Sequence, residues 1–556
     1  MKILTLILFF SFGMTYAQWE ENFELPGTDK KTYSNRKNIY EMNEDEWQST
    51  IETGKIHALI YPIKTTQFLL PYDLLTKLFS FKSENPNYQK VFSVINKISP
   101  YKSFEDVLKS LGLNTYPLEE NNNFNIPKLA PEQKIHPMGM TLMKKFGTTG
   151  LTFSCASCHS SNLFGVKVLG LTNRFPRPNH FFHQLKTLRF GIPVPLIKEM
   201  TGSSENDAKL FQNDKYLLNF IGTKDPEVLG LDTSLAQVGI SLSLRHQDEY
   251  ASFNKAALLN PLPHPLSYKV ADSKPAVWWN LKYKTRWLSD GSIVSGNPIY
   301  TNFLWNEIGR GADLKELSGW LKENQKIVKE LTAAAFASEA PHYNQFFPNT
   351  INLEKAQRGE ILFNKNCAGC HGYYEKNWSS PDADKLSYNE LIKTNRVKYH
   401  RKTPVKDVGT DAGRYEGMKY FADDLNRLKI SQEMGVKVVP QIGYVPPPLV
   451  GIWARWPYFH NNSAPTLCDV LSPVSQRPVT FYMMDSIDPK IHFDQKCNGY
   501  PRIAPENYRK PLYLYDTTKL GLSNKGHEKK ILLDENGREK FSHQDKFDLI
   551  EFLKTL

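Results

Sequence analysis

Two pentapeptides of nearly identical sequence constrain this chain more than any other feature. Residues 155–159 read Cys-Ala-Ser-Cys-His, and residues 367–371 read Cys-Ala-Gly-Cys-His. Cys-x-x-Cys-His is the attachment signature of c-type haem: two thiols at this spacing form thioethers with one porphyrin, and the next imidazole binds its iron. The sequence therefore predicts two covalently held haem c groups. The residues that would hold them are Cys155, Cys158, His159, Cys367, Cys370 and His371.

The remaining cysteines argue against other interpretations of the pentapeptides. Of the six cysteines, the two outside the motifs are Cys468 and Cys497, and they do not form a second Cys-x-x-Cys pair that could complete a zinc site. A thiol–disulfide redox motif would need a strand-rich, thioredoxin-like setting that neither copy suggests. We expect Cys468 and Cys497 to pair in an oxidising compartment, where the bridge would contribute about 3–4 kcal/mol. Two buried thiols are the alternative.

The first residues predict export. Lys2 precedes a mostly apolar run over 3–14 and Thr-Tyr-Ala at 15–17, which is typical of a cleavable signal peptide of residues 1–17. The run is shorter than the about 20 residues that span a bilayer, and no later segment is long and apolar enough. Because haem c is attached outside the cytoplasm, signal and motifs agree. We expect a periplasmic or secreted protein without a stable membrane span, with a retained N-terminal anchor as the alternative.

Size and composition favour a large globular protein. The 556 residues suffice for roughly three or four average domains. The 35 prolines and 32 glycines indicate long loops between helices. A net charge of +11 would favour an acidic redox partner or simply aid solubility. Because the basic residues are scattered and not grouped beside stacking aromatics, we expect no nucleic-acid binding.

We expect a mainly α-helical fold with long loops, little β-structure and two cytochrome c-like haem domains. The predicted divisions are an N-terminal cap region over 18–130, a first haem domain over 131–340 and a second haem domain over 350–556. Within the cap region, the capping box at 103–106 predicts a short helix that runs to Leu111.

The second haem domain has the clearest helical pattern. Residues 356–363 predict a helix directly before the second motif, in which Gly359 would let another backbone approach. A capping box at 542–545 precedes apolar residues at helical spacing as far as Leu553. An opening helix that crosses a closing helix beside the haem is the architecture of class I cytochrome c.

A second repeat follows the two motifs. The stretches 275–292 and 448–463 are rich in proline and aromatic residues, and each ends in a turn triplet, Asp-Gly-Ser or Asn-Asn-Ser. We infer a gene duplication, with coincidence of loop composition as the alternative. When the triplets are aligned, His460 faces Ser289. The tryptophans of the first stretch could line the first haem, relay electrons between the haems or fill a core; they are Trp278, Trp279 and Trp287.

The ligand on the far side of each iron decides function, because a six-coordinate haem moves electrons and an open one can bind oxygen or peroxide. For the second haem, the Gly-flexed loop before the final helix favours His527, with His460 as the alternative. Further candidates for that haem are Met418, Met434, Met483 and Met484. For the first haem, the downstream candidates lie in no recognisable ligand loop; they are His180, His183 and Met200. The hypothesis is one closed and one open haem.

These features together resemble the dihaem rubber oxygenases (RoxA and RoxB) and their relatives. Besides the two motifs, the resemblance is carried by Pro-Tyr-Phe-His-Asn-Asn-Ser-Ala-Pro-Thr-Leu at 457–467 and Asn-Lys-Gly-His at 524–527, and it leaves 18–130 uncovered. The stretch at 457–467 is also similar to one in the MauG proteins and the bacterial dihaem cytochrome c peroxidases. The resemblance implies that the N-terminal haem, on His159, binds dioxygen in an apolar pocket. It also implies that the C-terminal haem has two histidine ligands, His371 and His527, and serves the electron supply.

The sequence and the resemblance lead to one expected function. We expect an exported dihaem c-type cytochrome that acts as a haem-dependent oxidoreductase, with His159 holding the catalytic iron and the second haem relaying electrons from a redox donor. The resemblance implies cleavage of double bonds in a hydrophobic, polyisoprene-like substrate by dioxygen. A dihaem cytochrome c peroxidase that uses peroxide and a non-catalytic periplasmic electron carrier are the alternatives.

Overall fold

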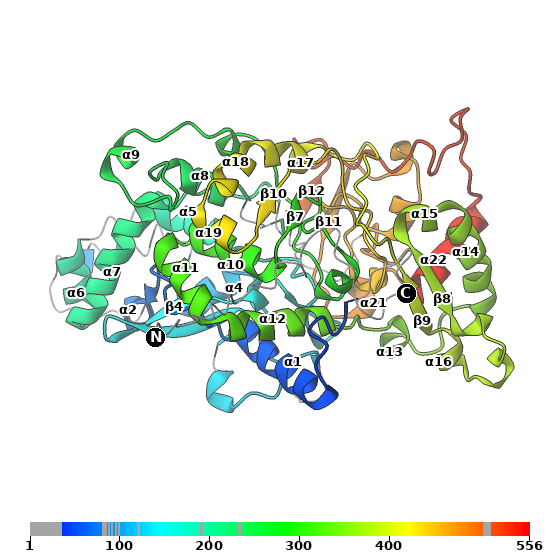
Figure 1. Cartoon of the computed structure of the whole chain (residues 1–556), viewed down its shortest axis with the longest axis horizontal. Helices are drawn as coiled ribbons and strands as arrows, with labels where there is room; N and C mark the ends of the chain where they lie inside the picture. Colours follow the sequence, from blue (N-terminus) through cyan, green and yellow to red (C-terminus); the bar gives the residue numbers. More distant parts are fainter. Residues whose placement is uncertain are drawn as a thin grey trace, which may run out of the picture.

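The computed structural model describes residues 36–79, 101–118, 123–134, 136–188, 193–228, 235–503 and 513–556, with residues 230–231 and a few single positions between 80 and 100. The described chain is mainly helical, as predicted, and the molecule is elongated (Figure 1). The longer helices are α1 (Glu44–Leu59), α5 (Pro178–Leu188), α6 (Val194–Thr201), α7 (Glu205–Leu217), α8 (Leu235–Ser243), α10 (Pro298–Gly309), α11 (Leu314–Glu323), α12 (Gln325–Ala337), α14 (Leu353–Asn366) and α22 (His543–Lys554). The shorter ones are α2 (Tyr72–Leu78), α4 (Phe104–Ser110), α9 (Lys255–Leu259), α13 (Tyr343–Phe346), α15 (Ala368–His371), α16 (Tyr388–Leu391), α17 (Gly413–Gly417), α18 (Ala422–Asn426), α19 (Lys429–Glu433), α20 (Leu467–Val470) and α21 (Pro489–His492).

The strands are short and form small sheets, in keeping with the expectation of little β-structure. Two sheets have three strands, in the orders β1-β4-β3 and β2-β6-β5, and the described chain also contains the pairs β10-β7, β11-β12 and β8-β9. The strands are β1 (Leu70–Pro71), β2 (Asn123–Phe124), β3 (Met140–Lys145), β4 (Thr148–Phe153), β5 (Ser160–Leu163), β6 (Val166–Leu169), β7 (Ile293–Ser295), β8 (Tyr373–Lys376), β9 (Thr394–Lys398), β10 (Lys437–Val438), β11 (Thr480–Met483) and β12 (Tyr513–Asp516).

The first pentapeptide lies between two β-hairpins. The hairpin β3–β4 ends directly before it and the hairpin β5–β6 begins directly after it. Each hairpin turns through a Phe-Gly pair with positive φ, at Phe146 and Gly147 and at Phe164 and Gly165, as tight two-residue turns require. Class I cytochrome c has a helix before its motif, so the surroundings of the first motif differ from the cytochrome c arrangement expected for it.

The second pentapeptide follows a helix, as predicted. It begins at the C-terminal end of α14, which crosses α22 at one end of the molecule (Figure 1). The predicted close approach occurs at Gly359, where a Cβ atom would stand 2.0 Å from the carbonyl oxygen of Asp548 on α22. Phe363 packs against Phe552 beside this crossing, with ring centroids 5.1 Å apart. The opening and closing helices therefore form the predicted pair.

The N-terminal region contributes helices to the main body of the protein. The helix α1 packs closely on α12, where Gly54 leaves no room for a side chain because a Cβ atom would lie 1.9 Å from the carbonyl oxygen of Glu330. The predicted cap of the helix is confirmed, because the hydroxyl oxygen of Ser103 accepts the N–H of Asp106 at the start of α4; the Asp106 carboxylate accepts the N–H of Lys102. Part of the region predicted as a cap is thus an integral layer of the fold.

The two largest hydrophobic cores each contain residues from both sides of the boundary at 340–350. In one core Trp305 packs on Phe421, with ring centroids 4.6 Å apart. In the other, Phe164 stacks on Trp456 at 5.7 Å. The two halves are therefore packed together through shared cores, and the division into 131–340 and 350–556 stays a prediction from the sequence.

The predicted disulfide between Cys468 and Cys497 is present, with Cα atoms 5.1 Å apart. The remaining cysteines, which belong to the two motifs, are not bridged. The predicted signal peptide, residues 1–17, lies outside the described residues. Within the described residues, we find no helix with both the length and the apolar character needed to cross a membrane.

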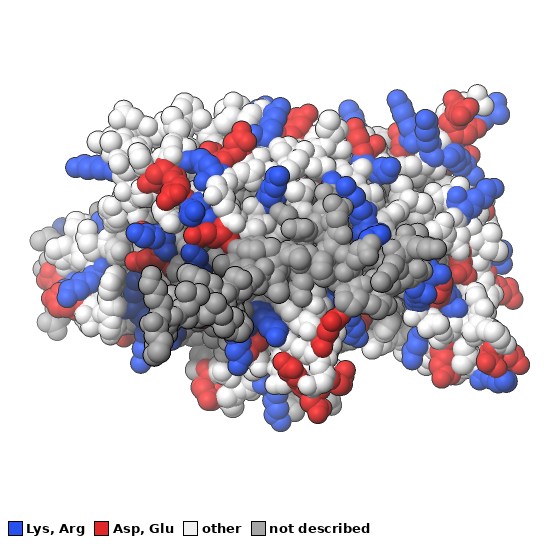
Figure 2. Space-filling view, viewed as in Figure 1, with Lys and Arg blue, Asp and Glu red and all other residues white. Residues whose placement is uncertain are grey.

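Charged side chains are mixed over the molecular surface shown in Figure 2. On that face, Lys and Arg side chains lie among Asp and Glu side chains. This distribution agrees with the scattered basic residues in the sequence.

Candidate functional site

Both pentapeptides face one cavity of about 470 Å³, which we call the central cavity. Its walls include His159 from the first motif and His371 from the second, together with His460 and His527 from the C-terminal part of the chain. Most of the lining is apolar, with a small number of polar groups, which is typical of a cofactor or ligand site. The fold thus brings two motifs that are more than 200 residues apart in the sequence to one cavity.

The first motif places the His159 imidazole against the start of the first repeat, at Ala276. A tight turn forms when Cys155 O accepts the N–H groups of Cys158 and His159, at 3.3 and 3.1 Å. Nδ1 of His159 then lies 2.9 Å from the carbonyl oxygen of Ala276. If Nδ1 carries the proton and donates it to this oxygen, Nε2 keeps its lone pair for a metal, which is the usual arrangement of a ligating histidine.

The second motif repeats this geometry. Cys367 O accepts the N–H of His371 at 3.0 Å, and Nδ1 of His371 lies 2.9 Å from the carbonyl oxygen of Pro447. Both candidate proximal histidines are therefore fixed in the same way, by one backbone carbonyl each. The four thiols and two imidazoles fit the requirements of two haem c groups.

A further link joins each motif to the segment that carries its carbonyl acceptor. In the first half, the peptide group of Gly170 makes the link: its N–H donates to the carbonyl of His159, and its carbonyl accepts the N–H of Trp278. In the second half, the hydroxyl of Tyr374 takes both roles, donating to the carbonyl of His371 and accepting the N–H of Leu449. A tyrosine side chain thus replaces a backbone peptide at the corresponding place.

The two carbonyl acceptors belong to the repeat identified in the sequence. Ala276 and Pro447 are 171 positions apart, and the same offset aligns the two turn triplets. The backbone conformation also agrees within the triplets, since Gly291 and Asn462, again related by this offset, have φ of 67° and 64°. The structure therefore supports duplication over coincidence of composition.

The two repeats also contact each other reciprocally. The N–H of Lys274 donates to the carbonyl of His460, and the N–H of Val445 donates to the carbonyl of Ser289, both at 2.8 Å. The two donors, Lys274 and Val445, are 171 positions apart, and so are the two acceptors, Ser289 and His460, so each bond is the counterpart of the other. Such a pattern is that of an approximate two-fold axis between the repeats, comparable to the contact of two subunits in a symmetric dimer.

His527 lies across the cavity from His371. The two ring centroids are 6.4 Å apart. Two imidazoles on one metal would have centroids about 6 Å apart, given bonds of about 2 Å and about 1.1 Å from each nitrogen to its ring centre. His527 has a positive φ of 56°, and its N–H donates to the carbonyl of Val408 at 2.8 Å. This pair of histidines therefore fits a haem with two axial imidazoles.

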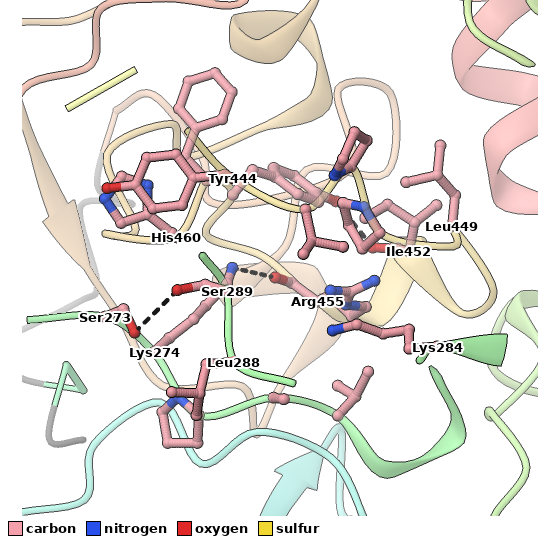
Figure 3. A pocket seen from close by; sticks show the side chains of 18 of the residues that line it. Ser273, Lys274, Lys284, Leu288, Ser289, Tyr444, Leu449, Ile452, Arg455 and His460 are labelled. Atoms are coloured by element: carbon pink, nitrogen blue, oxygen red, sulfur yellow. Dashed lines mark hydrogen bonds between the residues drawn. The ribbon is translucent and has the colours of Figure 1, made fainter. Parts of the chain in front are cut away.

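His460, the alternative ligand, lies elsewhere in the cavity wall. Its ring stacks on Tyr444, with centroids 3.9 Å apart and an angle of 18° between the planes (Figure 3). Burial, together with the charges of Arg414 and Lys274, lowers the pKa of His460 to about 3. Its Nε2 is buried and has no hydrogen-bond partner in the described part of the chain. The geometry therefore favours His527 over His460 as the partner of His371.

The other predicted ligands lie away from the central cavity. His180 contacts Asp225 through Nδ1, and neither it nor His183 nor Met200 lines the cavity. The methionines proposed for the second haem fill hydrophobic cores instead; they are Met418, Met434, Met483 and Met484. Among the described residues that line the cavity, the imidazoles are those of His159, His371, His460 and His527, and there is no methionine.

Buried cations stand beside the two motifs. Lys284 and Arg455, which are related by the repeat offset, lie next to each other in the cavity wall (Figure 3). Burial, together with the charge of Arg455, lowers the pKa of Lys284 to about 8. Lys274 donates through Nζ to the carbonyls of Arg455 and Pro457. A cavity lined by mutually repelling cations is suited to an anionic group, such as the carboxylates of a haem.

The candidate ligands are neutral imidazoles at physiological pH. Burial lowers the pKa of His159 to about 4, against the opposing effect of the hydrogen bond to Ala276. Burial, helped by His371 and Arg477, lowers the pKa of His527 to about 3. Burial also lowers the pKa of His371. Neutral imidazole is the form that binds a metal.

The three tryptophans of the first repeat divide between the predicted roles. Trp278 and Trp287 line the cavity, and the ring of Trp278 lies 5.7 Å from that of His159. Trp279 is fully buried and donates through Nε1 to the carbonyl of Val450, so it lies between the two repeats.

Sequence reasoning missed the groups that orient the histidines. Ala276 and Pro447 act through backbone carbonyls, which no side-chain motif reveals, and Tyr374 has no counterpart in the first half. The proline-rich composition of both stretches was the available signal, since it marked these segments as a repeat.

Comparison with known proteins supports a c-type cytochrome. Residues 443–482 match the family model described as RoxA-like, cytochrome c-like, and this match covers the whole second repeat, 448–463, and the segment after it. Two uncharacterized proteins of Sinorhizobium fredii (strain NBRC 101917 / NGR234) are similar to this chain. The protein y4iM is 29% identical over 233 residues, which is 38% of this chain and 50% of y4iM. The protein y4iJ is 25% identical over 261 residues, which is 37% of this chain and 39% of y4iJ. The chain therefore spans half or less of the length of these curated relatives.

Proposed function

We propose that this chain is an exported c-type cytochrome with two haem c groups, and that it is an oxidoreductase that activates dioxygen at the first of them. Cys155 and Cys158 would attach one porphyrin, and Cys367 and Cys370 the other. The cytochrome c-like family match at 443–482 supports the class of cofactor. The paired geometry of the two motifs supports the number of cofactors.

One observation carries the proposal: the two sides of the cavity are unequal. His371 has a second imidazole opposite it, that of His527, at a distance suited to joint coordination of one metal. For His159, the ring beside it is that of Trp278, and the remaining imidazole of the described cavity lining, His460, stacks on Tyr444 instead. We therefore infer a closed haem on His371 and an open haem on His159.

The residues of the chain have defined tasks in this proposal. A bound haem supplies an iron that transfers electrons when six-coordinate and can bind and reduce dioxygen when one position is free. The carbonyls of Ala276 and Pro447 hold the proton of each imidazole on Nδ1, which keeps Nε2 directed to the metal. Lys284 and Arg455 supply positive charge for the carboxylates of the cofactors. Electrons would enter at the second haem from an external donor.

The resemblance to the rubber oxygenases and the apolar cavity lining support a proposal for the substrate class. We propose a hydrophobic substrate with carbon–carbon double bonds, of the polyisoprene type, which the resemblance to the rubber oxygenases implies. The apolar character of most of the lining is compatible with such a substrate. A dihaem peroxidase and an electron carrier differ from this proposal in what the first haem binds.

The proposal is tested on the protein matured in a host that attaches haem c. Mass spectrometry should find two haems, and the double variants C155A/C158A and C367A/C370A should each lose one. Optical spectra of the reduced protein with carbon monoxide should then change at one haem of two, and only C155A/C158A should abolish that change. Oxygen uptake with a polyisoprene oligomer completes the assay. Absence of carbon monoxide binding at both haems overturns the open site and favours a carrier, and rapid turnover of peroxide without oxygen uptake favours a peroxidase.

A further inference from the structure

The helix α10 has the same place after the first repeat as α20 has after the second. Each helix begins a few residues beyond its turn triplet and is capped by a polar side chain: Asn297 accepts the N–H of Ile299, and Thr466 accepts the N–H of Asp469. The end of α20, Val470, lines the cavity together with His527, opposite His371. By the same relation, α10 covers the side of the cavity that faces His159.

Polar groups on α10 line this part of the cavity. Asn302, Trp305 and Asn306 lie at helical spacing on one face of α10. All three line the central cavity, and they also line a smaller adjoining cavity next to Cys155, Cys158 and His159. The resemblance to the rubber oxygenases implies an apolar pocket at this haem, and these residues make it partly polar.

Trp305 carries a buried hydrogen-bond donor without an acceptor. The residue is 6% exposed, and within the described part of the chain its indole Nε1 has no hydrogen-bond partner. Its ring is fixed by packing on Phe421, with centroids 4.6 Å apart. An unsatisfied buried N–H costs free energy, so a native protein that retains one has a reason outside its own hydrogen-bond network.

The two asparagines provide a second donor beside it. Nδ2 of Asn306 donates to Oδ1 of Asn302 at 3.0 Å. That bond uses the amide oxygen of Asn302 as the acceptor, so its Nδ2 group is the part left to donate. Asn302 therefore offers a donor at the cavity wall beside Trp305.

We propose that Trp305, with Asn302 beside it, donates a hydrogen bond to a small ligand with negative charge on its outer atom when that ligand binds at the first haem. Dioxygen and small anions such as fluoride belong to this class, and carbon monoxide serves as its probe. The inference rests on the proposed function, since it requires an open position at the haem on His159. It adds that the pocket stabilises charge and does more than exclude water.

The variants W305F and N302L remove the donors and keep similar volumes. The control is W320F on α11, because Trp320 belongs to the same core, packs near Phe303 and does not line the cavity. The first measurement is the infrared C–O stretch of the reduced carbon monoxide complex of the two-haem protein. A donor near the oxygen lowers this frequency, so W305F should raise it and W320F should leave it unchanged.

The second measurement is the affinity of the oxidised protein for fluoride. Loss of one hydrogen bond to a charged acceptor should weaken binding by about tenfold or more in W305F, with a smaller loss in N302L. If carbon monoxide binds but neither the stretch nor the fluoride affinity changes in either variant, the donor role is wrong and the open haem stands. If carbon monoxide binds neither haem, both the open haem and the donor role are wrong.

Discussion

Leu288 and Phe459 share a left-handed backbone conformation, with φ of 69° and 63°, at the same position of the two repeats. Bulky residues seldom adopt this conformation, because their Cβ atoms crowd the backbone. Two such residues at matched positions show that the duplicated segment preserves a costly local geometry and not just a composition. We expect that geometry to be needed for placing the residues that follow it at the cavity.

Replacement of His527 by alanine should open the second haem. Since His527 faces His371 at a distance suited to joint coordination, H527A should convert that haem from low spin to high spin and allow it to bind carbon monoxide. The matched variant is H460A, which removes another cavity imidazole. We expect H460A to keep the low-spin spectrum, and loss of that spectrum in H460A with retention in H527A would reverse the assignment.

Replacement of Tyr374 by phenylalanine should loosen the second motif. The hydroxyl donates to the carbonyl of His371 and accepts the N–H of Leu449, so Y374F removes a hydrogen bond from two partly buried backbone groups. The free energy of unfolding should fall by about 1–3 kcal/mol. Denaturant titration measures it, with Y373F as the control because Tyr373 is 43% exposed. Equal stabilities of the two variants would contradict the linking role.

Loss of the bridge between Cys468 and Cys497 should destabilise the C-terminal part. The bridge closes a loop with a sequence separation of 29 residues, which corresponds to about 3–4 kcal/mol on the chain-entropy model. The double variant C468S/C497S should show this loss in denaturant titration and should keep both haems, because neither residue belongs to a motif. A loss of haem in this variant would mean that the bridge is needed for maturation.

Lys376 should make stability depend on pH. Burial lowers its pKa to about 7 in the folded protein, whereas in the unfolded chain it is about 10.4. Between these values the unfolded chain binds a proton that the folded chain does not, so the free energy of unfolding rises with pH, by at most about 1.4 kcal/mol per unit. The variant K376M should lose this slope between pH 7 and pH 9.5. The exposed Lys393 supplies the control, K393M, and identical pH profiles for both variants would refute the assignment.

The sequence predicted the structure around the second motif better than the structure around the first motif, for a physical reason. The helix before Cys367 has a continuous 3.6-residue pattern, and the capping box at Ser542 fixes the start of the closing helix, so both elements are encoded locally. The first motif is framed by hairpins whose short strands lack a regular alternation of buried and exposed residues, so they are harder to distinguish from loops. The N-terminal helix α1 has local signals, with Asn43 as its cap and an acidic first turn, but its close packing on α12 at Gly54 is a long-range contact that the sequence does not specify.

Within the candidate site, the two haem-attachment motifs were predictable from the sequence, and the placement of the other side chains around the cavity was not. The spacing of Cys155, Cys158 and His159 has chemical meaning by itself. The choice of His527 over His460 depended on where a loop folds in space, although a glycine before His527 gave a hint. The donor face of α10 could not be read from the sequence, because Trp305 in an apolar helix suggests a core residue.

The reciprocal hydrogen bonds at Lys274 and Val445 mean that each half completes the other. A truncated chain ending between the repeats would leave both carbonyl-bearing segments unsupported, so neither fragment is expected to work as a one-haem carrier. Because the two copies of the duplicated segment stabilise each other, one copy could no longer be replaced as a whole without the other. New chemistry would then have to come from single substitutions within the two repeats.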